Sequence, residues 1–192
     1  MSVNYLNIYE TCFDNESYSK DHHIQYDFVV DEIKKLFINK TESEFSLIDI
    51  GSGRGQLINL IQKNFNNVKI TSVDLKKFND LDINFIKCNL SLENERELLK
   101  NNVYDVLSCT DVFEHLDKSF IEEVISLCSS LSKNCIFAIA NHSDIINNIE
   151  LHTIQENDIW WEKYLLKYFE IKEKHIKYDN RLYMYTCKSI NF

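Results

Sequence analysis

The sequence contains no proline, and its only three glycines fall within one five-residue window. Glycine is a usual residue of turns, so a chain that hardly uses it keeps it where other residues do not serve. The window lies in the segment Asp49-Ile50-Gly51-Ser52-Gly53-Arg54-Gly55. Glycines at three alternate positions indicate a backbone with positive φ angles or one that a ligand approaches closely. This segment is therefore the first candidate for a functional site.

Long apolar segments and paired cysteines are also missing. The longest uninterrupted apolar run, residues 135–140, is far shorter than the roughly 20 residues of a membrane-spanning helix. The N-terminus has neither a basic region nor an apolar one, so we expect no secretory signal and a cytoplasmic location. The six cysteines show no C-x-x-C pair and no metal-finger spacing. This pattern predicts small buried side chains in a reducing compartment.

Positive charge is in short supply, since 21 Lys and Arg residues stand against 30 Asp and Glu residues and the formal net charge is −9. Binding to a nucleic-acid backbone draws its affinity from Lys and Arg contacts, so this balance disfavours a nucleic-acid partner. The apolar fraction of 44% is that of an ordinary globular protein. We expect a single domain over residues 1–192 that acts on a small molecule and not at a membrane.

Short β-type runs alternate with helical ones along the chain, which predicts an α/β fold with a doubly wound parallel sheet. The expected helices cover residues 23–38, 56–65, 91–100, 118–131 and 159–168, and Ser91 is the predicted cap of the third. The expected strands cover residues 45–50, 68–73, 83–87, 103–108, 135–140, 169–177 and 182–187. Only four residues join the last two strands, as in a β-hairpin. The last strand should therefore be antiparallel to the rest.

The glycine segment follows a predicted strand and precedes a predicted helix, which places it at the carboxyl edge of the sheet, where ligands bind. The dinucleotide fingerprint G-x-G-x-x-G needs glycine at position 56, and this chain has Gln56. Asp49, two residues before the first glycine, would repel a pyrophosphate and attract a cationic group. Asp74, at the end of the next strand, can accept both hydroxyls of a ribose. A cation and a ribose without a phosphate describe S-adenosylmethionine.

Residues 47–55 resemble the first motif of the class I S-adenosylmethionine-dependent methyltransferases. Residues 72–74 are similar to the family's ribose-binding motif, and residues 85–90 to its adenine-binding motif, with Asn89 where the family usually has Asp. Residues 104–109 resemble its fourth strand, so the resemblance covers nearly the whole chain. The family has a Rossmann-like, seven-stranded, mostly parallel sheet whose last strand is antiparallel. The resemblance implies S-adenosylmethionine as cofactor, bound by Asp49, Gly51, Ser52, Gly53, Gly55, Asp74, Leu75, Asn89, Leu90 and Cys109.

Residues of the methyl acceptor site should follow the fourth and fifth strands. Methyltransferases of amide or exocyclic amino nitrogens commonly carry an Asn/Asp-Pro-Pro-Tyr motif there, whereas this chain has Cys109-Thr110-Asp111. Asp111, Glu114 and His115 stand at i, i+3 and i+4, and on a helical turn they would project to one side. Two carboxylates and an imidazole suit Mg²⁺, Mn²⁺ or Fe²⁺ better than an ion that prefers thiolates. Similar E-x-x-E-H segments hold a divalent metal in small-RNA 2′-O-methyltransferases and in some ubiquinone-pathway O-methyltransferases.

A further metal ligand would come from the region after the fifth strand, where His152 is the first candidate and His142 the second. In the alternative, the Glu-His pair binds no metal, and a histidine acts as a base or lines the floor of the site. Trp160 and Trp161, farther along, are expected to be core residues. Two interpretations stay open: a catalytic set of His115, His152 and Asp111, and a metal site of Asp111, Glu114, His115 and His152.

Two segments are expected to enclose the acceptor, namely an irregular N-terminal lid over residues 1–22 and a loop and helix over residues 141–168. The aromatic residues that we expect in and next to the lid are Tyr5, Tyr9, Phe13, Tyr18, His22 and His23.

These features predict a methyltransferase that O-methylates a small polar or nucleotide-linked acceptor. Size and codon usage suggest a bacterial tailoring enzyme, and a sugar or phosphoramidate group of a capsule or surface-glycan precursor is one setting for it. The first alternative is a metal-dependent RNA 2′-O-methyltransferase, which the acidic-histidine segment supports and the net charge opposes. The second alternative is a catalytically inactive cofactor-binding subunit that activates a partner.

Overall fold

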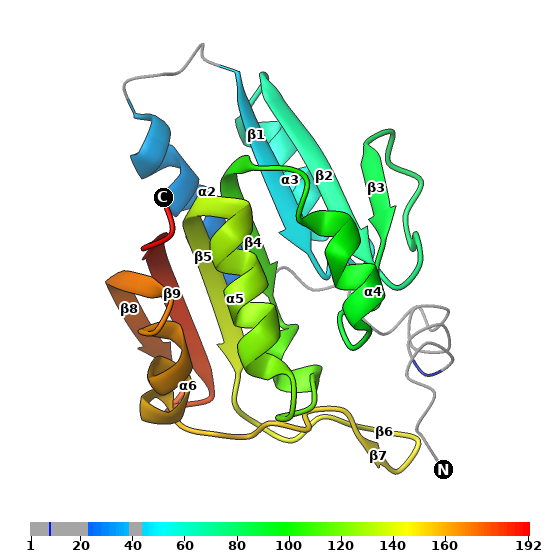
Figure 1. Cartoon of the computed structure of the whole chain (residues 1–192), viewed down its shortest axis with the longest axis vertical. Coiled ribbons are helices and arrows are strands. Elements are labelled where there is room, and N and C mark those ends of the chain that lie inside the picture. The colour runs from blue at the N-terminus through cyan, green and yellow to red at the C-terminus, as the bar shows by residue number, and fades with distance from the viewer. Residues whose placement is uncertain (1–7, 9–22, 39–43) are drawn as a thin grey trace.

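The computed structural model describes residue 8 and residues 23–38 and 44–192 (Figure 1). Its main sheet has seven strands in the order β3-β2-β1-β4-β5-β9-β8. Strands β1 to β5 pair in parallel, whereas β9 is antiparallel to both β5 and β8. The predicted Rossmann-like sheet is confirmed, including its antiparallel last strand. The strands are β1 Phe45–Ile50, β2 Val68–Asp74, β3 Asn84–Lys87, β4 Tyr104–Thr110, β5 Ser132–Ala140, β8 Phe169–Lys177 and β9 Leu182–Ser189.

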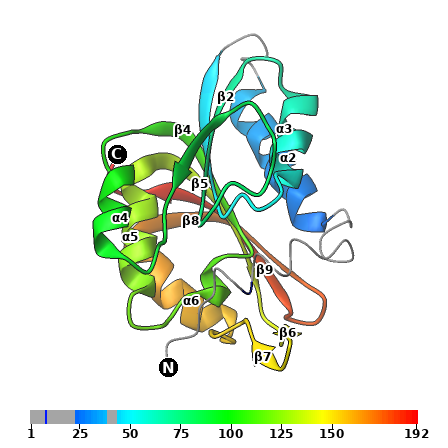
Figure 2. The ribbon, with the colours of Figure 1, turned by 90° about the vertical axis from the view of Figure 1, so that its right-hand side faces the viewer.

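Helices cover both faces of this sheet, and Figure 2 shows α2 and α3 on one side and α4, α5 and α6 on the other. Residues 121, 124, 125 and 128 of α5 are fully buried, which is the helical spacing that turns one apolar stripe toward a sheet. None of the described helices is long and apolar enough to span a membrane. The helices are α2 Ile24–Phe37, α3 Gln56–Asn64, α4 Glu93–Arg96, α5 Ile121–Leu131 and α6 Asp158–Leu165, with 3₁₀ turns η1 Glu97–Leu99 and η2 Phe113–His115.

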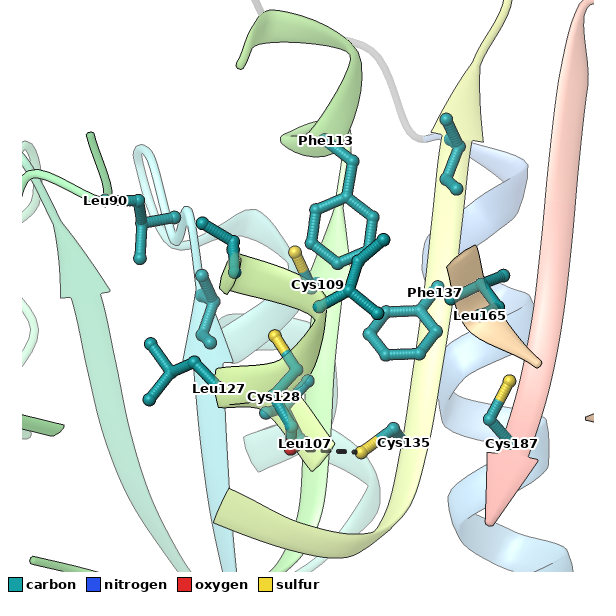
Figure 3. Packing of buried hydrophobic residues seen from close by; sticks show 14 of the residues in the cluster. Leu90, Leu107, Cys109, Phe113, Leu127, Cys128, Cys135, Phe137, Leu165 and Cys187 are labelled. Carbon is teal, nitrogen blue, oxygen red and sulfur yellow. Dashed lines mark hydrogen bonds between the residues drawn. The ribbon is translucent and has the colours of Figure 1, made fainter. Parts of the chain in front are cut away.

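The larger part of the core lies between the sheet and helices α5 and α6 (Figure 3). Cys128 of α5 and Cys135 of β5 lie next to each other in it, and the Cys135 thiol is 3.7 Å from the Cys128 carbonyl oxygen. Burial raises the pKa of the Cys128 thiol to about 12, so the thiol stays protonated and unreactive. The prediction of small buried cysteines is confirmed for the five that the structure describes: Cys88, Cys109, Cys128, Cys135 and Cys187.

The predicted cap at Ser91 is wrong. Helix α4 has Leu92 as its N-cap, and no side chain caps it. The backbone N–H and the hydroxyl of Ser91 instead donate to Asn89 Oδ1, at 3.0 and 2.7 Å. An Asn side chain that bonds two residues onward forms a turn that competes with a helix start. The helix predicted over residues 91–100 is therefore reduced to the short α4 and η1.

A small hairpin that the sequence did not predict follows β5. It consists of β6 Ile145–Ile146 and β7 Ile149–Glu150, which pair antiparallel (Figure 1). Its turn residues Asn147 and Asn148 have φ angles of 51° and 61°, a conformation that asparagine tolerates in two-residue hairpin turns. The hairpin and α6 make up the loop and helix expected over residues 141–168. The predicted lid over residues 1–22 lies outside the described residues, residue 8 excepted.

Candidate active site

The three glycines form the turn between β1 and α3. Gly51, Gly53 and Gly55 all have positive φ angles, of 76°, 48° and 78°. A Cβ atom at Gly51 would lie 2.1 Å from Cγ2 of Val112, and one at Gly55 would lie 2.6 Å from Cδ1 of Leu81. The turn therefore requires glycine for its backbone angles and, at two positions, for space. Val112 precedes η2, so the first glycine also touches the segment that follows β4.

Asp74, the last residue of β2, holds this turn in place. Its Oδ2 accepts a hydrogen bond from the Gly53 N–H at 2.8 Å, and its Oδ1 accepts one from the Leu75 N–H at 2.7 Å. Burial raises the pKa of Asp74 to about 6, and the two N–H donors oppose that rise. The carboxylate thus fixes the glycine turn, and its contact with a ribose stays a prediction.

Asp49 and Ser52 are buried polar residues in the same turn. Asp49 is only 2% exposed, and its Oδ1 accepts a hydrogen bond from Ser108 Oγ at 2.7 Å. Burial raises its pKa to about 7, the Ser108 bond lowers it and the charge of Asp74 raises it further. Ser52 Oγ is buried without a hydrogen-bond partner in the described part of the chain. A buried carboxylate and an unpartnered hydroxyl fit a turn that binds a cationic ligand with hydrogen-bonding groups.

The other predicted cofactor residues divide between the edge of the sheet and the core. Asn89 follows β3, and its side-chain oxygen accepts two bonds from Ser91. Leu90 is 8% exposed and belongs to the core cluster. The side chain of Cys109, at the end of β4, packs in the core beside Phe113 (Figure 3). The side chain at position 109 is therefore not available to a ligand.

The segment after β4 does not form the predicted helical turn. Asp111, the residue after β4, has a φ angle of 55°, and η2 is a 3₁₀ turn. Asp111 Oδ2 accepts a hydrogen bond from Gln25 Nε2 at 2.5 Å, so α2 holds this carboxylate. Sequence reasoning missed Gln25, although it stands on the buried stripe of α2 with Val29 and Ile33. A polar residue at an apolar position of a helix was the available signal.

Glu114, His115 and His152 come together without Asp111. Each offers one possible ligand atom, and these atoms lie within 4.8 Å of one another, the one such group found among the described residues. Glu114 is fully buried, and its Oε1 accepts the Ala140 N–H at 2.9 Å. Its Oε2 is buried without a hydrogen-bond partner in the part of the chain that the structure describes. Burial and the neighbouring charge of Asp111 raise the pKa of Glu114 well above its ordinary value.

The two histidines of this group are held in one tautomer. His115 Nδ1 lies 3.1 Å from the Leu151 carbonyl oxygen, and His152 Nδ1 lies 2.6 Å from the His142 carbonyl oxygen. Because a carbonyl oxygen only accepts, each ring carries its proton on Nδ1, and Nε2 is the nitrogen that can bind a metal or a proton. Burial lowers the pKa of both rings, that of His115 to about 3. Neutral imidazoles with this orientation suit a metal site or a general base.

Hydrogen bonds between the segments after β4 and after β7 bring these residues together. The Ile154 N–H donates to the Glu114 carbonyl oxygen at 3.0 Å, and the Thr153 hydroxyl donates to the Leu116 carbonyl oxygen at 2.6 Å. The rings of His142 and His152 lie 4.9 Å apart, so the second-choice histidine is adjacent to the group. Trp161 is fully buried in the core, as predicted, whereas Trp160 is only partly buried and packs against the core.

The strand order, the glycine turn after β1 and the aspartate that ends β2 together define a class I S-adenosylmethionine-dependent methyltransferase. A family model described as a methyltransferase domain matches residues 21–187, and the chain belongs to this family. A search of curated proteins finds no match.

Solved methyltransferase structures share the fold. An S-adenosylmethionine-dependent methyltransferase from Clostridium acetobutylicum is 14% identical with a TM-score of 0.66, over 97% of this chain and 99% of that one. The N-methyltransferase NodS from Bradyrhizobium japonicum, in complex with S-adenosyl-L-homocysteine, is 10% identical with a TM-score of 0.66, over 98% and 100%. Magnesium protoporphyrin IX methyltransferase from Synechocystis, with bound S-adenosylmethionine, is 14% identical with a TM-score of 0.65, over 98% of each chain.

Proposed function

We propose that the protein methylates a hydroxyl group of a small polar acceptor, with S-adenosylmethionine as the methyl donor. The group of Glu114, His115 and His152 carries this proposal. It follows the carboxyl ends of β4 and β5, and Val112 connects it to the glycine turn. A hydroxyl must lose its proton when it attacks the methyl group, and this group of residues offers either a metal site or a base for that step.

The glycine turn supports the assignment of the methyl donor to this edge of the sheet. We assign Asp74 to the ribose hydroxyls, Asp49 to the cationic part of the donor, and Asn89 with Leu90 to the adenine. The turn has no Cβ atoms at its three glycines, and Ser52 Oγ lacks a hydrogen-bond partner within the described residues. Both observations fit a ligand that approaches the backbone closely.

For the metal-dependent form of this proposal, the donors are Glu114 Oε2 and the Nε2 atoms of His115 and His152. One carboxylate and two imidazoles suit a first-row divalent cation such as Mn²⁺ or Fe²⁺ better than Mg²⁺, which prefers oxygen ligands. When bound, such a cation would supply Lewis acidity that lowers the pKa of an acceptor hydroxyl. Asp111, held by Gln25, is assigned to the acceptor and not to the cation. In the metal-free form, His152 accepts the hydroxyl proton directly.

Experiments on metal binding and chelation distinguish the metal-dependent form of the proposal from the metal-free form. Binding of Mn²⁺ followed by electron paramagnetic resonance should weaken at least about tenfold in Glu114→Gln and change little in Asp111→Asn. Methyl ethers formed on a panel of sugars and sugar nucleotides, detected by mass spectrometry, should disappear with EDTA and return with Mn²⁺. Product that forms equally well with EDTA, but not in His152→Ala, would contradict the metal-dependent form and support the base.

The proposed acceptor is a sugar or phosphoramidate group such as those of surface-glycan precursors. In its support, the chain adds only the hairpin β6–β7 between β5 and α6, which is little surface for a large acceptor. An RNA 2′-O-methyltransferase is the second candidate, because the same carboxylate and histidines suit a metal beside a ribose hydroxyl. The net charge of −9 opposes it. RNA binding with a steep salt dependence would support the second candidate.

A further inference from the structure

His152 joins Glu114 and His115 from the loop that follows β7. Its position therefore depends on the contacts that hold this loop. The hairpin β6–β7 has strands of two residues each, and an isolated hairpin of that size is barely stable in water. Contacts beyond the pairing of these two short strands must therefore hold its two ends together.

The carboxylate of Glu150 provides such contacts. Its Oε1 accepts the Asp144 N–H at 2.8 Å and the His152 N–H at 3.0 Å, and its Oε2 accepts the Ser143 hydroxyl. Two of these donors precede the hairpin and one follows it, so a single side chain joins the segment before β6 to the segment after β7. The Leu151 N–H adds a fourth contact, with the Asp144 carbonyl oxygen at 2.8 Å.

These bonds determine where the ring of His152 lies. Glu150 holds the His152 backbone, and the His142 carbonyl oxygen, one residue before Ser143, holds its Nδ1. The ring is thereby placed at 4.6 Å from the ring of His115, edge to face. If the Glu150 contacts were absent, the segments bearing His142 and His152 could separate, and the Nδ1 contact that sets the tautomer would be lost.

We infer that Glu150 is a positioning residue, which fixes the backbone and the tautomer of His152 so that its Nε2 faces Glu114 and His115. This inference rests on the proposed function of that group. Groups that hold metal-binding histidines in place are commonly worth 10–100-fold in metal affinity, on the order of the effect expected here. Glu150 itself touches neither the cation nor the acceptor in this role.

The test compares Glu150→Ala and Glu150→Gln with the matched control Glu156→Ala, which removes a carboxylate of the same loop that pairs with Lys118. Long-range ¹H–¹⁵N spectra of the metal-free protein, with the His152 signals assigned by His152→Gln, report the tautomer directly. The wild type and Glu156→Ala should show a proton on Nδ1 and none on Nε2. Glu150→Ala should show averaged signals, and Glu150→Gln, whose amide oxygen still accepts both N–H groups, should stay close to the wild type.

Mn²⁺ affinity is the second readout, with S-adenosylhomocysteine affinity as a check of the fold. Glu150→Ala should lose about tenfold or more in Mn²⁺ affinity and keep its S-adenosylhomocysteine affinity. Unchanged His152 signals in Glu150→Ala would overturn the inference, as would unchanged Mn²⁺ affinity. If the wild type binds no Mn²⁺ but the His152 signals change as expected, the metal-dependent form fails and the positioning role stands. Should Glu150→Ala not fold, Glu150→Asp, whose shorter side chain cannot reach all three donors, takes its place.

Discussion

The two halves of the candidate active site are built in different ways. The cofactor half is one contiguous turn, residues 49–55, whose shape comes from backbone angles and which Asp74 fastens through a backbone N–H. The acceptor half is assembled from side chains of three separate segments, namely α2, residues 111–115 and residues 142–152. The cofactor half depends on the absence of Cβ atoms at its glycines, whereas the acceptor half depends on the side chains that its residues carry.

This difference indicates which half of the candidate active site can acquire a different reaction. A turn made by backbone geometry admits only a ligand that fits that geometry, and the side chains of Asp49 and Asp74 adjust the affinity for that ligand. A group made of side chains can acquire another reaction when one of those side chains is replaced, while the fold stays the same. The methyl donor is therefore assigned to the turn, and the choice of acceptor to the group around His152.

The largest expected effect follows from adding one methyl group to the cofactor half. In Gly51→Ala the left-handed backbone alone costs about 1–2 kcal/mol, and the new Cβ would lie 2.1 Å from Val112 Cγ2. We expect the free energy of unfolding to fall by about 2 kcal/mol or more. Affinity for S-adenosylhomocysteine, measured by calorimetry, should fall below detection.

Val112→Ala, alone and together with Gly51→Ala, is the control for this experiment. Removing the Val112 methyl groups should restore part of the stability of Gly51→Ala, because only the backbone strain then remains. If Gly51→Ala keeps wild-type stability and affinity, the turn does not depend on the absence of a Cβ atom. The contrast between the cofactor half and the acceptor half would then be wrong.

The cofactor half could be predicted from the sequence because its determinants are local. Three glycines at fixed spacing and two aspartates at the ends of neighbouring strands indicate both the geometry and the charge of the site. The sheet was predictable for the same reason, since strand and helix periods alternate along the chain and a four-residue connection indicates the final hairpin.

The acceptor half could not be predicted in full, because its contacts join distant residues. Gln25 and Asp111 are 86 residues apart, and no sequence pattern connects an amide in α2 to a carboxylate after β4. The i, i+3, i+4 spacing presumed a helix, whereas the positive φ angle of Asp111 and the 3₁₀ turn η2 replace that helical turn. His152 was predicted as a partner, but the role of Glu150 depends on a hairpin too short to show a period.

The next expected effect concerns the charge of the cofactor half. Burial raises the pKa of Asp49 to about 7 and that of Asp74 to about 6, so both carboxylates take up protons as the pH falls toward 6. A protonated Asp49 no longer attracts a sulfonium cation. We expect the affinity for S-adenosylmethionine to fall about fivefold between pH 8 and pH 6, relative to that for S-adenosylhomocysteine, which lacks this charge. Calorimetry over this range with both ligands measures the ratio.

Asp49→Asn, which keeps a hydrogen-bond acceptor for Ser108 and removes the charge, should flatten this ratio. The same pKa values predict the pH dependence of the ligand-free protein. Because the folded state holds these protons more tightly than the unfolded chain, whose ordinary pKa is 3.8, the two aspartates make stability fall as pH rises from about 4 to about 7. If the ratio of the two affinities stays constant with pH in the wild type, the assignment of Asp49 to the cationic part of the donor is wrong.

The smallest expected effect concerns helix α6, and it tests whether Mn²⁺ binding in the acceptor half depends on the stability of this helix. Asn157 caps α6, and its side-chain oxygen accepts the Trp160 N–H at 2.9 Å. Asn157→Ala should lower the free energy of unfolding by about 1 kcal/mol and the melting temperature by about 2–4 °C. Ser91→Ala, at the position where a cap was predicted and none exists, should change stability by less than about 0.5 kcal/mol. Mn²⁺ affinity should be unchanged in both variants, because the contacts of His152 lie before α6. A loss of Mn²⁺ affinity in Asn157→Ala would instead show that the acceptor half depends on the helix as well as on its own side-chain contacts.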